Sequence, residues 1–199
     1  MTGATLTQTA DHWHAGFRSA DLEQLFAQCF GAGYQTCLSG GHDEPFYQPA
    51  RDGQPARLCY RADFFRSALH EVAHWCIAGP ARRQQTDFGY WYEPDGRSVE
   101  RQQAFLMAEV RPQAFELVFC AAAGHRFSVS LDNLGGEACG DVRSFEARVC
   151  ALAEQLLVAP PARMAQWARC LSAYYRGVDA LPDRPMLAAC FQPIGVLSP

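Results

Sequence analysis

The chain has 199 residues, of which 49% are hydrophobic and 19% are charged. This composition supports a buried core and argues against an intrinsically disordered protein. A formal net charge of -4 argues against a nucleic-acid-binding protein, since phosphate binding depends on concentrated positive charge. No stretch approaches the roughly 18 apolar residues of a membrane helix, and the N-terminal sequence has neither the basic nor the apolar region of a secretory signal. We therefore expect a cytoplasmic protein that binds neither nucleic acid nor membrane.

The nine cysteines are spread along the chain and form no Cys-x-x-Cys pair. This spacing is typical of neither a zinc ribbon nor a secreted domain held together by disulfides. We expect most of the cysteines to be reduced and to pack as small apolar side chains.

The first predicted helix covers residues 21–30, where apolar residues recur at helical spacing and Asp21 can cap the N-terminus. Short strand-like segments follow at 34–38 and 46–48. A further segment, 57–61, is predicted to be an edge strand.

The second predicted helix covers residues 63–79. Asp63 can cap its N-terminus, and the pair Gly79-Pro80 is typical of the residues that follow a helix. An aromatic strand is then expected at 87–92.

A long helical stretch is predicted from Ser98 to Gly124. Pro112 lies inside this stretch and should kink the helix or restart it. Two more helices are expected at 144–157 and 162–175.

Together these elements predict a single α+β domain that is predominantly helical and has a small β component. Residues 1–20 are expected to form an N-terminal tail, residues 21–176 the functional domain, and residues 177–199 an irregular C-terminal segment.

The strongest functional signal is the HExxH sequence that runs from His70 to His74. On a helix the two histidines lie about 40° apart on one face, so both imidazoles can bind one metal ion. The opposite face carries the apolar residues that we expect in the core, namely Phe64, Phe65, Ala68, Leu69, Val72, Trp75 and Cys76. The histidine face should therefore point to solvent or to a metal cleft.

A metal site needs a further ligand, and the long helical stretch supplies a polar stripe of Glu109, Gln113 and Glu116. A carboxylate among apolar neighbours is costly unless it is paired or bound to a cation. Metal ligation by Glu109 and a salt bridge to an arginine are both compatible with this pattern. The other candidate ligands are His125, Glu116, Asp43 and Glu44.

Two histidines and one carboxylate are compatible with two kinds of enzyme. A zinc metallopeptidase would use Glu71 as the general base on a metal-bound water. A non-haem iron oxygenase would use the same three ligands and leave positions open for dioxygen and substrate. The place of Glu71 directly after the first histidine favours the peptidase. A non-enzymatic metal-binding module is the third alternative.

At these residues the sequence resembles the elongation factor P hydroxylases of bacteria. The matching segments are 43–45, 70–83, 87–97, 109–124 and 129–134, and weaker similarity covers about 22–175. The resemblance implies a monooxygenase that uses Fe(II), with zinc as the alternative metal, and dioxygen as co-substrate. Its partner would be elongation factor P whose lysine already carries a β-lysyl group.

By position, the resemblance implies that His70 and His74 are metal ligands and that Glu109 is the third. Glu71 would be a catalytic residue that orients a histidine or a water. Because Glu71 lies about 100° around the helix from His70, we do not expect it to join the face that the imidazoles define.

The modified lysine is cationic, so acidic and aromatic side chains near the site are candidates for binding it. The candidate carboxylates are Asp43, Glu44 and Asp87, each of which is equally a turn or cap residue. The candidate aromatic residues are Tyr90, Trp91 and Tyr92, which would flank the arm through cation–π contacts or simply pack in the core. Arg82 and Arg83 would contact an acidic partner or complement the helix dipole.

Overall fold

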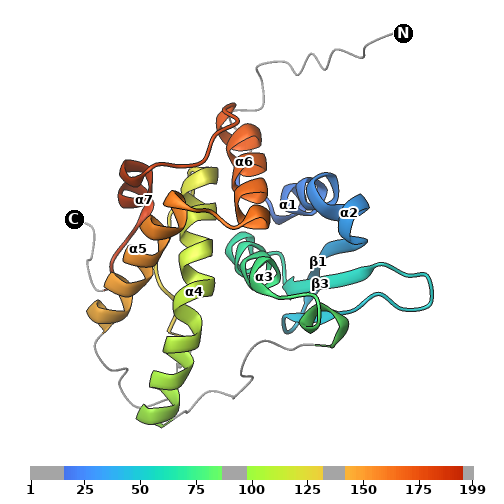
Figure 1. Ribbon diagram of the computed structural model, residues 1–199, viewed down its shortest axis with the longest axis horizontal. Coiled ribbons are helices and arrows are strands. Elements are labelled where there is room, and N and C mark those ends of the chain that lie inside the picture. Colours follow the sequence, from blue (N-terminus) through green and yellow to red (C-terminus); the bar gives the residue numbers. More distant parts are fainter. Residues whose placement is uncertain (1–15, 87–97, 132–141, 195–199) are drawn as a thin grey trace.

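The computed structural model describes residues 16–86, 98–131 and 142–194. Along the chain its helices are α1 (Ser19–Phe26), α2 (Ala32–Tyr34), α3 (Phe65–Ile77), α4 (Val99–Ala123), α5 (Val142–Val158), α6 (Ala162–Arg176) and α7 (Arg184–Cys190). A π-helical turn (Ala27–Gly31) joins α1 to α2, and a 3₁₀ turn (Arg82–Gln84) follows α3. With one small sheet, this confirms the predicted α+β domain of mostly helical content (Figure 1). No helix of the described ranges is both long and apolar enough to cross a membrane.

The sheet has three strands in the order β1 (Thr36–His42), β3 (Ala56–Arg61) and β2 (Phe46–Gln48). β1 runs parallel to β3, and β2 runs antiparallel to it. The prediction that 57–61 is an edge strand is wrong, because β3 is the central strand. Residues 58–60 are all buried, which is typical of a strand that is covered on both faces.

The histidine helix α3 packs against both β3 and α4 (Figure 1). Its apolar face is buried as predicted, except for Phe64, which is 55% exposed. Phe64 precedes the helix at the N-cap position, so helical periodicity does not set its direction. The prediction that Asp63 caps the helix is therefore wrong.

The long helix α4 contacts α3, α5, α6 and α7 (Figure 1). The Ser98 side chain caps it as predicted, by accepting a hydrogen bond from the backbone N–H of Arg101. The helix neither ends nor restarts at Pro112. A proline inside a helix costs about 3 kcal/mol. Residues 112–123 are all buried, and this packing offsets that cost.

The first helix begins earlier than predicted, at Ser19. Asp21 does not cap it but lies in its first turn, where Arg18 donates a hydrogen bond of 2.6 Å to its carboxylate. The predicted helix over 21–30 is one α-helix followed by a π-helical turn.

The C-terminal segment, expected to be irregular, contains α7. The Asp183 side chain caps this helix by accepting a hydrogen bond from the backbone N–H of Met186. A backbone bridge between Phe127 and Phe191 then ties the segment to the residues that follow α4.

One disulfide joins Cys29 in the π-helical turn to Cys170 in α6. The two cysteines are 141 residues apart in the sequence, so local spacing could not predict that they pair. The remaining cysteines of the described ranges are free, in agreement with the prediction for most of them, and these are Cys37, Cys59, Cys76, Cys120, Cys150 and Cys190.

Candidate metal centre

Three of the predicted ligands converge between α3 and α4. The Nε2 atoms of His70 and His74 lie 3.0 Å apart. Each of them is 3.4 Å from an oxygen of Glu109. His70, His74 and Glu109 are also the group of described residues whose ligand atoms lie close enough together to hold one metal ion.

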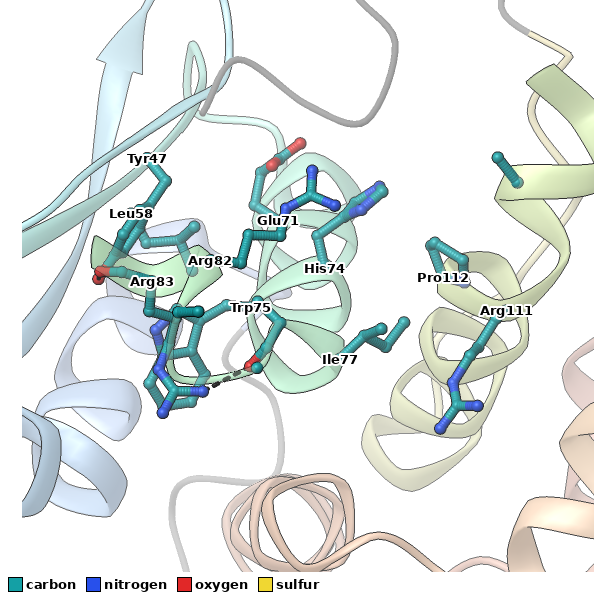
Figure 2. A pocket seen from close by; sticks show the side chains of 14 residues that line it. Tyr47, Leu58, Glu71, His74, Trp75, Ile77, Arg82, Arg83, Arg111 and Pro112 are labelled. Atoms are coloured by element: carbon teal, nitrogen blue, oxygen red, sulfur yellow. Dashed lines mark hydrogen bonds between the residues drawn. The ribbon is translucent and has the colours of Figure 1, made fainter. Parts of the chain in front are cut away.

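The sequence explains why these three side chains meet. The spacing of four residues stacks the two imidazoles one turn apart on α3, with ring centroids 4.7 Å apart. Glu109 faces them from α4, where its side chain is almost fully buried. Figure 2 shows the imidazole of His74 directed toward α4.

The donor set fits a divalent transition metal. Ligand atoms about 2.1 Å from one ion, at angles between octahedral and tetrahedral, lie about 3.0–3.4 Å from one another. The two Nε2 atoms are 3.0 Å apart, and each lies 3.4 Å from a different oxygen of Glu109, so the carboxylate faces both imidazoles at distances of this range. Imidazole nitrogens and a carboxylate suit both iron and zinc, so the geometry supports a metal site without selecting the metal.

Behind His70 lies a network of charged side chains that the sequence did not reveal. His70 Nδ1 lies 2.9 Å from an oxygen of Glu116. Arg66 donates to the other Glu116 oxygen from Nε at 3.0 Å and from a terminal nitrogen at 2.7 Å. Arg66 also donates to the backbone carbonyl of Ser128 at 2.7 Å. The network therefore fixes both the position and the orientation of the His70 ring.

The sequence predicts other roles, or none, for the residues of this network. Glu116 was predicted only as a rival ligand, and Arg66 was given no role. One signal was available, because Glu109 and Glu116 are seven residues apart and thus lie two turns apart on one helix face. The pairing with Arg66 depends on the register of α3 against α4, which the sequence does not contain.

The charges of the site are strongly coupled. Burial opposes protonation of His70, but the hydrogen bond that its ring donates to Glu116 and the negative charges of Glu109 and Glu116 prevail and raise its pKa to about 10. Burial likewise opposes ionisation of Glu109 and Glu116, yet the nearby histidines, and Arg66 in the case of Glu116, keep both carboxyl pKa values below the ordinary one. The site therefore requires a positive charge between its ligands, which either a proton or a metal cation can supply.

Glu71 lies outside the triad and faces a cavity of about 570 Å³ next to it (Figure 2). His74 lines the same cavity, so one metal ligand is shared between the triad and the cavity wall. The apolar part of the wall includes Leu58, Trp75, Ile77, Ala81, Ala108 and Pro112. Burial raises the pKa of the Glu71 carboxyl group above its ordinary value, so its charge is costly without a positive partner.

Apart from Glu116, which contacts His70, the other candidate ligands have surroundings of their own. The His125 ring packs between Phe17 and Phe65, with centroid separations of 4.7 and 5.1 Å, and its Nδ1 lies 2.6 Å from the carbonyl of Arg126. Asp43 and Glu44 lie exposed in the bend between β1 and β2.

The structure describes only some of the residues that were predicted to bind the substrate. Asp87, Tyr90, Trp91 and Tyr92 lie outside the described residues, and substrate binding by Asp43 and Glu44 stays a prediction. Arg82 and Arg83 both line the cavity. Arg83 also donates to the carbonyl of Ala78 at the end of α3, which corresponds to the predicted helix-dipole role.

Comparison with known proteins identifies the family. The family model described as elongation factor P hydroxylase matches residues 25–183. The chain is also similar to the elongation factor P lysine hydroxylase of Haemophilus influenzae, with 52% identity over 130 residues, which are 65% of this chain and 72% of that protein. The family-model match includes the segments that carry the triad. The chain therefore belongs to the elongation factor P hydroxylase family.

Proposed function

We propose that this protein is an iron-dependent monooxygenase that hydroxylates elongation factor P on the lysine carrying a β-lysyl group. The observation that carries the proposal is a triad of two histidines and one carboxylate, next to a cavity, in a member of this family. Action on a translation factor would place the protein in the cytoplasm.

The chemistry explains why a metal is needed. Hydroxylation converts a C–H bond to C–OH with one atom of dioxygen, while the other atom leaves as water with two electrons from an external reductant and two protons. Iron, when bound, supplies the dioxygen-activating chemistry that amino-acid side chains lack. His70, His74 and Glu109 would hold it from one side, so that the opposite side stays open.

The surrounding residues of the chain prepare the ligands. Glu116 accepts a hydrogen bond from Nδ1 of His70, and this fixes the tautomer whose Nε2 lone pair points to Glu109 and His74. Arg66 keeps Glu116 ionised and in place. These contacts let the imidazoles meet the ion without rearrangement.

The zinc metallopeptidase alternative needs Glu71 as a general base within reach of a metal-bound water. The Glu71 side chain lines the same cavity as the ligand His74, a position that a general base and a substrate-binding residue could equally occupy. The family membership is therefore what favours the hydroxylase.

Metal content and product mass test the proposal directly. Protein purified without added metal should contain iron, and the iron-loaded protein with a reductant should add one oxygen atom to β-lysylated elongation factor P. His70→Ala and His74→Ala should each lose both properties while keeping the circular dichroism of the wild type. Stoichiometric zinc with cleavage of the partner's backbone would instead establish the peptidase.

A further inference from the structure

The cavity beside the triad has an uneven distribution of charge. Among the described residues that line it, Glu71 is the only carboxylate, whereas Arg82, Arg83 and Arg111 are cationic. No described residue forms a hydrogen bond or an ion pair with Glu71. A partly buried carboxylate without a partner is unusual, because its charge is normally balanced.

The cavity extends along α3. Glu71 lies near the middle of this helix, and Arg83 lies beyond its C-terminal end, where it contacts the carbonyl of Ala78. The seven residues from Glu71 to Ala78 correspond to about 10 Å of helix axis. Figure 2 shows Glu71 and Arg83 at separate ends of the group of lining side chains.

We propose that this cavity binds the aliphatic arm of a cationic side chain and that Glu71 forms an ion pair with the arm's ammonium group. The proposal rests on the proposed function and assigns Glu71 a role in substrate specificity, in place of a role as metal ligand or general base. The arm is the β-lysyl extension, which carries free amino groups on a chain of methylenes.

The wall of the cavity complements such an arm. Leu58, Ile77 and Pro112 supply apolar surface for the methylene groups, whose removal from water is favourable. Arg83 and Arg111 lie apart from Glu71 and repel an ammonium group from their parts of the cavity (Figure 2). An arm that enters the cavity therefore has one favourable place for its charge, which is beside Glu71.

The same arrangement positions the arm for reaction. Glu71 precedes the ligand His74 by three residues, and both side chains line the cavity. An ammonium group held by Glu71 thus keeps the adjoining methylenes close to the triad. An uncharged arm would lack this anchor, so the cavity would distinguish amino from acylated amino groups.

Binding measured without turnover tests the ion pair. Wild-type and Glu71→Gln proteins are loaded with Fe(II) and titrated anaerobically with β-lysylated elongation factor P and with the same partner after acetylation of the free amino groups. Glu71→Gln should keep stoichiometric iron but bind the amino form about 10- to 100-fold more weakly, which is the range for a hydrogen bond to a charged group. It should no longer distinguish the amino form from the acetylated one.

Glu154→Gln is the matched control, because Glu154 is partly exposed on α5 and pairs with Arg184 away from the cavity. It should bind both partner forms like the wild type. Acetylation tests the same ion pair in the wild-type protein, so the test does not depend on the folding of the variant.

Two results would overturn the inference. One is a Glu71→Gln protein that binds the amino form as tightly as the wild type but turns over slowly, which would show a role in the reaction itself. The other is a wild-type protein that hydroxylates its partner but binds the acetylated arm equally well. A wild-type protein that does not hydroxylate β-lysylated elongation factor P would contradict the proposed function instead.

Discussion

His70 and Glu71 are neighbours in the sequence, yet their side chains lie in two regions of different character. His70 contacts Glu109, Glu116 and His74, and these contacts form a closed network. Glu71 faces a cavity and forms no hydrogen bond or ion pair with any described residue. The closed region, which is made of His70, His74, Glu109 and Glu116, suits an ion that stays bound. The open region, which is the cavity that Glu71 lines, suits a ligand that binds and leaves.

The largest effect should come from removing the carboxylate of the closed region. We expect Glu109→Ala to weaken iron binding by more than about 100-fold, because two neutral imidazoles remain and the loss exceeds that of an outer partner. Glu71→Gln should retain iron at stoichiometric metal and lose activity through weaker binding of its partner. Anaerobic iron titration of both variants measures this. Wild-type affinity in Glu109→Ala would place the third ligand elsewhere.

Glu116 should have the next largest effect, because it acts on the metal through His70. We expect Glu116→Gln to lower iron affinity by about 10- to 100-fold without removing a ligand. Arg66→Lys, which keeps the charge but not the paired contacts to Glu116, should cause a smaller loss. Metal titration with thermal melting separates an effect on the site from unfolding. Equal affinities of Glu116→Gln and the wild type would show that the network does not orient His70.

Metal binding should also depend on pH through His70. Its pKa is raised to about 10 in the metal-free protein, and its proton must leave before Nε2 can bind a cation. Below this pKa, each decrease of one pH unit should weaken metal binding about tenfold. Titration calorimetry in buffers of different ionisation enthalpy should detect about one released proton. No released proton at neutral pH would contradict the raised pKa.

The same pKa predicts the stability of the metal-free protein. A histidine with a raised folded-state pKa contributes stability that is complete below its unfolded pKa of about 6.5 and is lost as the pH rises toward about 10. The metal-free protein should therefore lose this contribution between these values, whereas the metal-bound protein should not. Melting curves with and without metal over this range measure the difference.

The two regions also differ in how far the sequence predicted them. HExxH and the polar stripe identified all three members of the triad, because helical periodicity determines which residues share a face. Periodicity does not predict contacts that depend on how distant elements pack against each other. Examples are the contact of Arg66 with Glu116 and the cavity that Tyr47 and Arg111 both line.

The fold shows the same limit. Local patterns placed α3, α4, α5 and α6 within a few residues, since amphipathic periodicity and caps are local. The central place of β3 and the pairing of Cys29 with Cys170 depend on distant parts of the chain and were not predicted. A local signal was missed in α7, where Asp183 precedes a proline in the first turn.

The smallest effect should come from the arginines of the open region. Arg111 is exposed on α4, lines the cavity, and its guanidinium lies 5.6 Å from the Phe115 ring centroid. A charge at this position should attract an acidic surface of the partner, and exposed charges of this kind act mainly on the association rate. We expect Arg111→Gln to raise KM for elongation factor P about two- to fivefold and to reduce its dependence on salt, with iron content and kcat unchanged.

Arg143→Gln is the control for this last prediction, because Arg143 is exposed on α5, on the side of α4 away from α3 (Figure 1). Both variants lose one positive charge, so an effect of net charge alone would be equal in the two. Stopped-flow association at two ionic strengths separates a local from a general effect. A large loss of kcat in Arg111→Gln would show that Arg111 acts on the reaction, and the open region would then extend from substrate binding into catalysis.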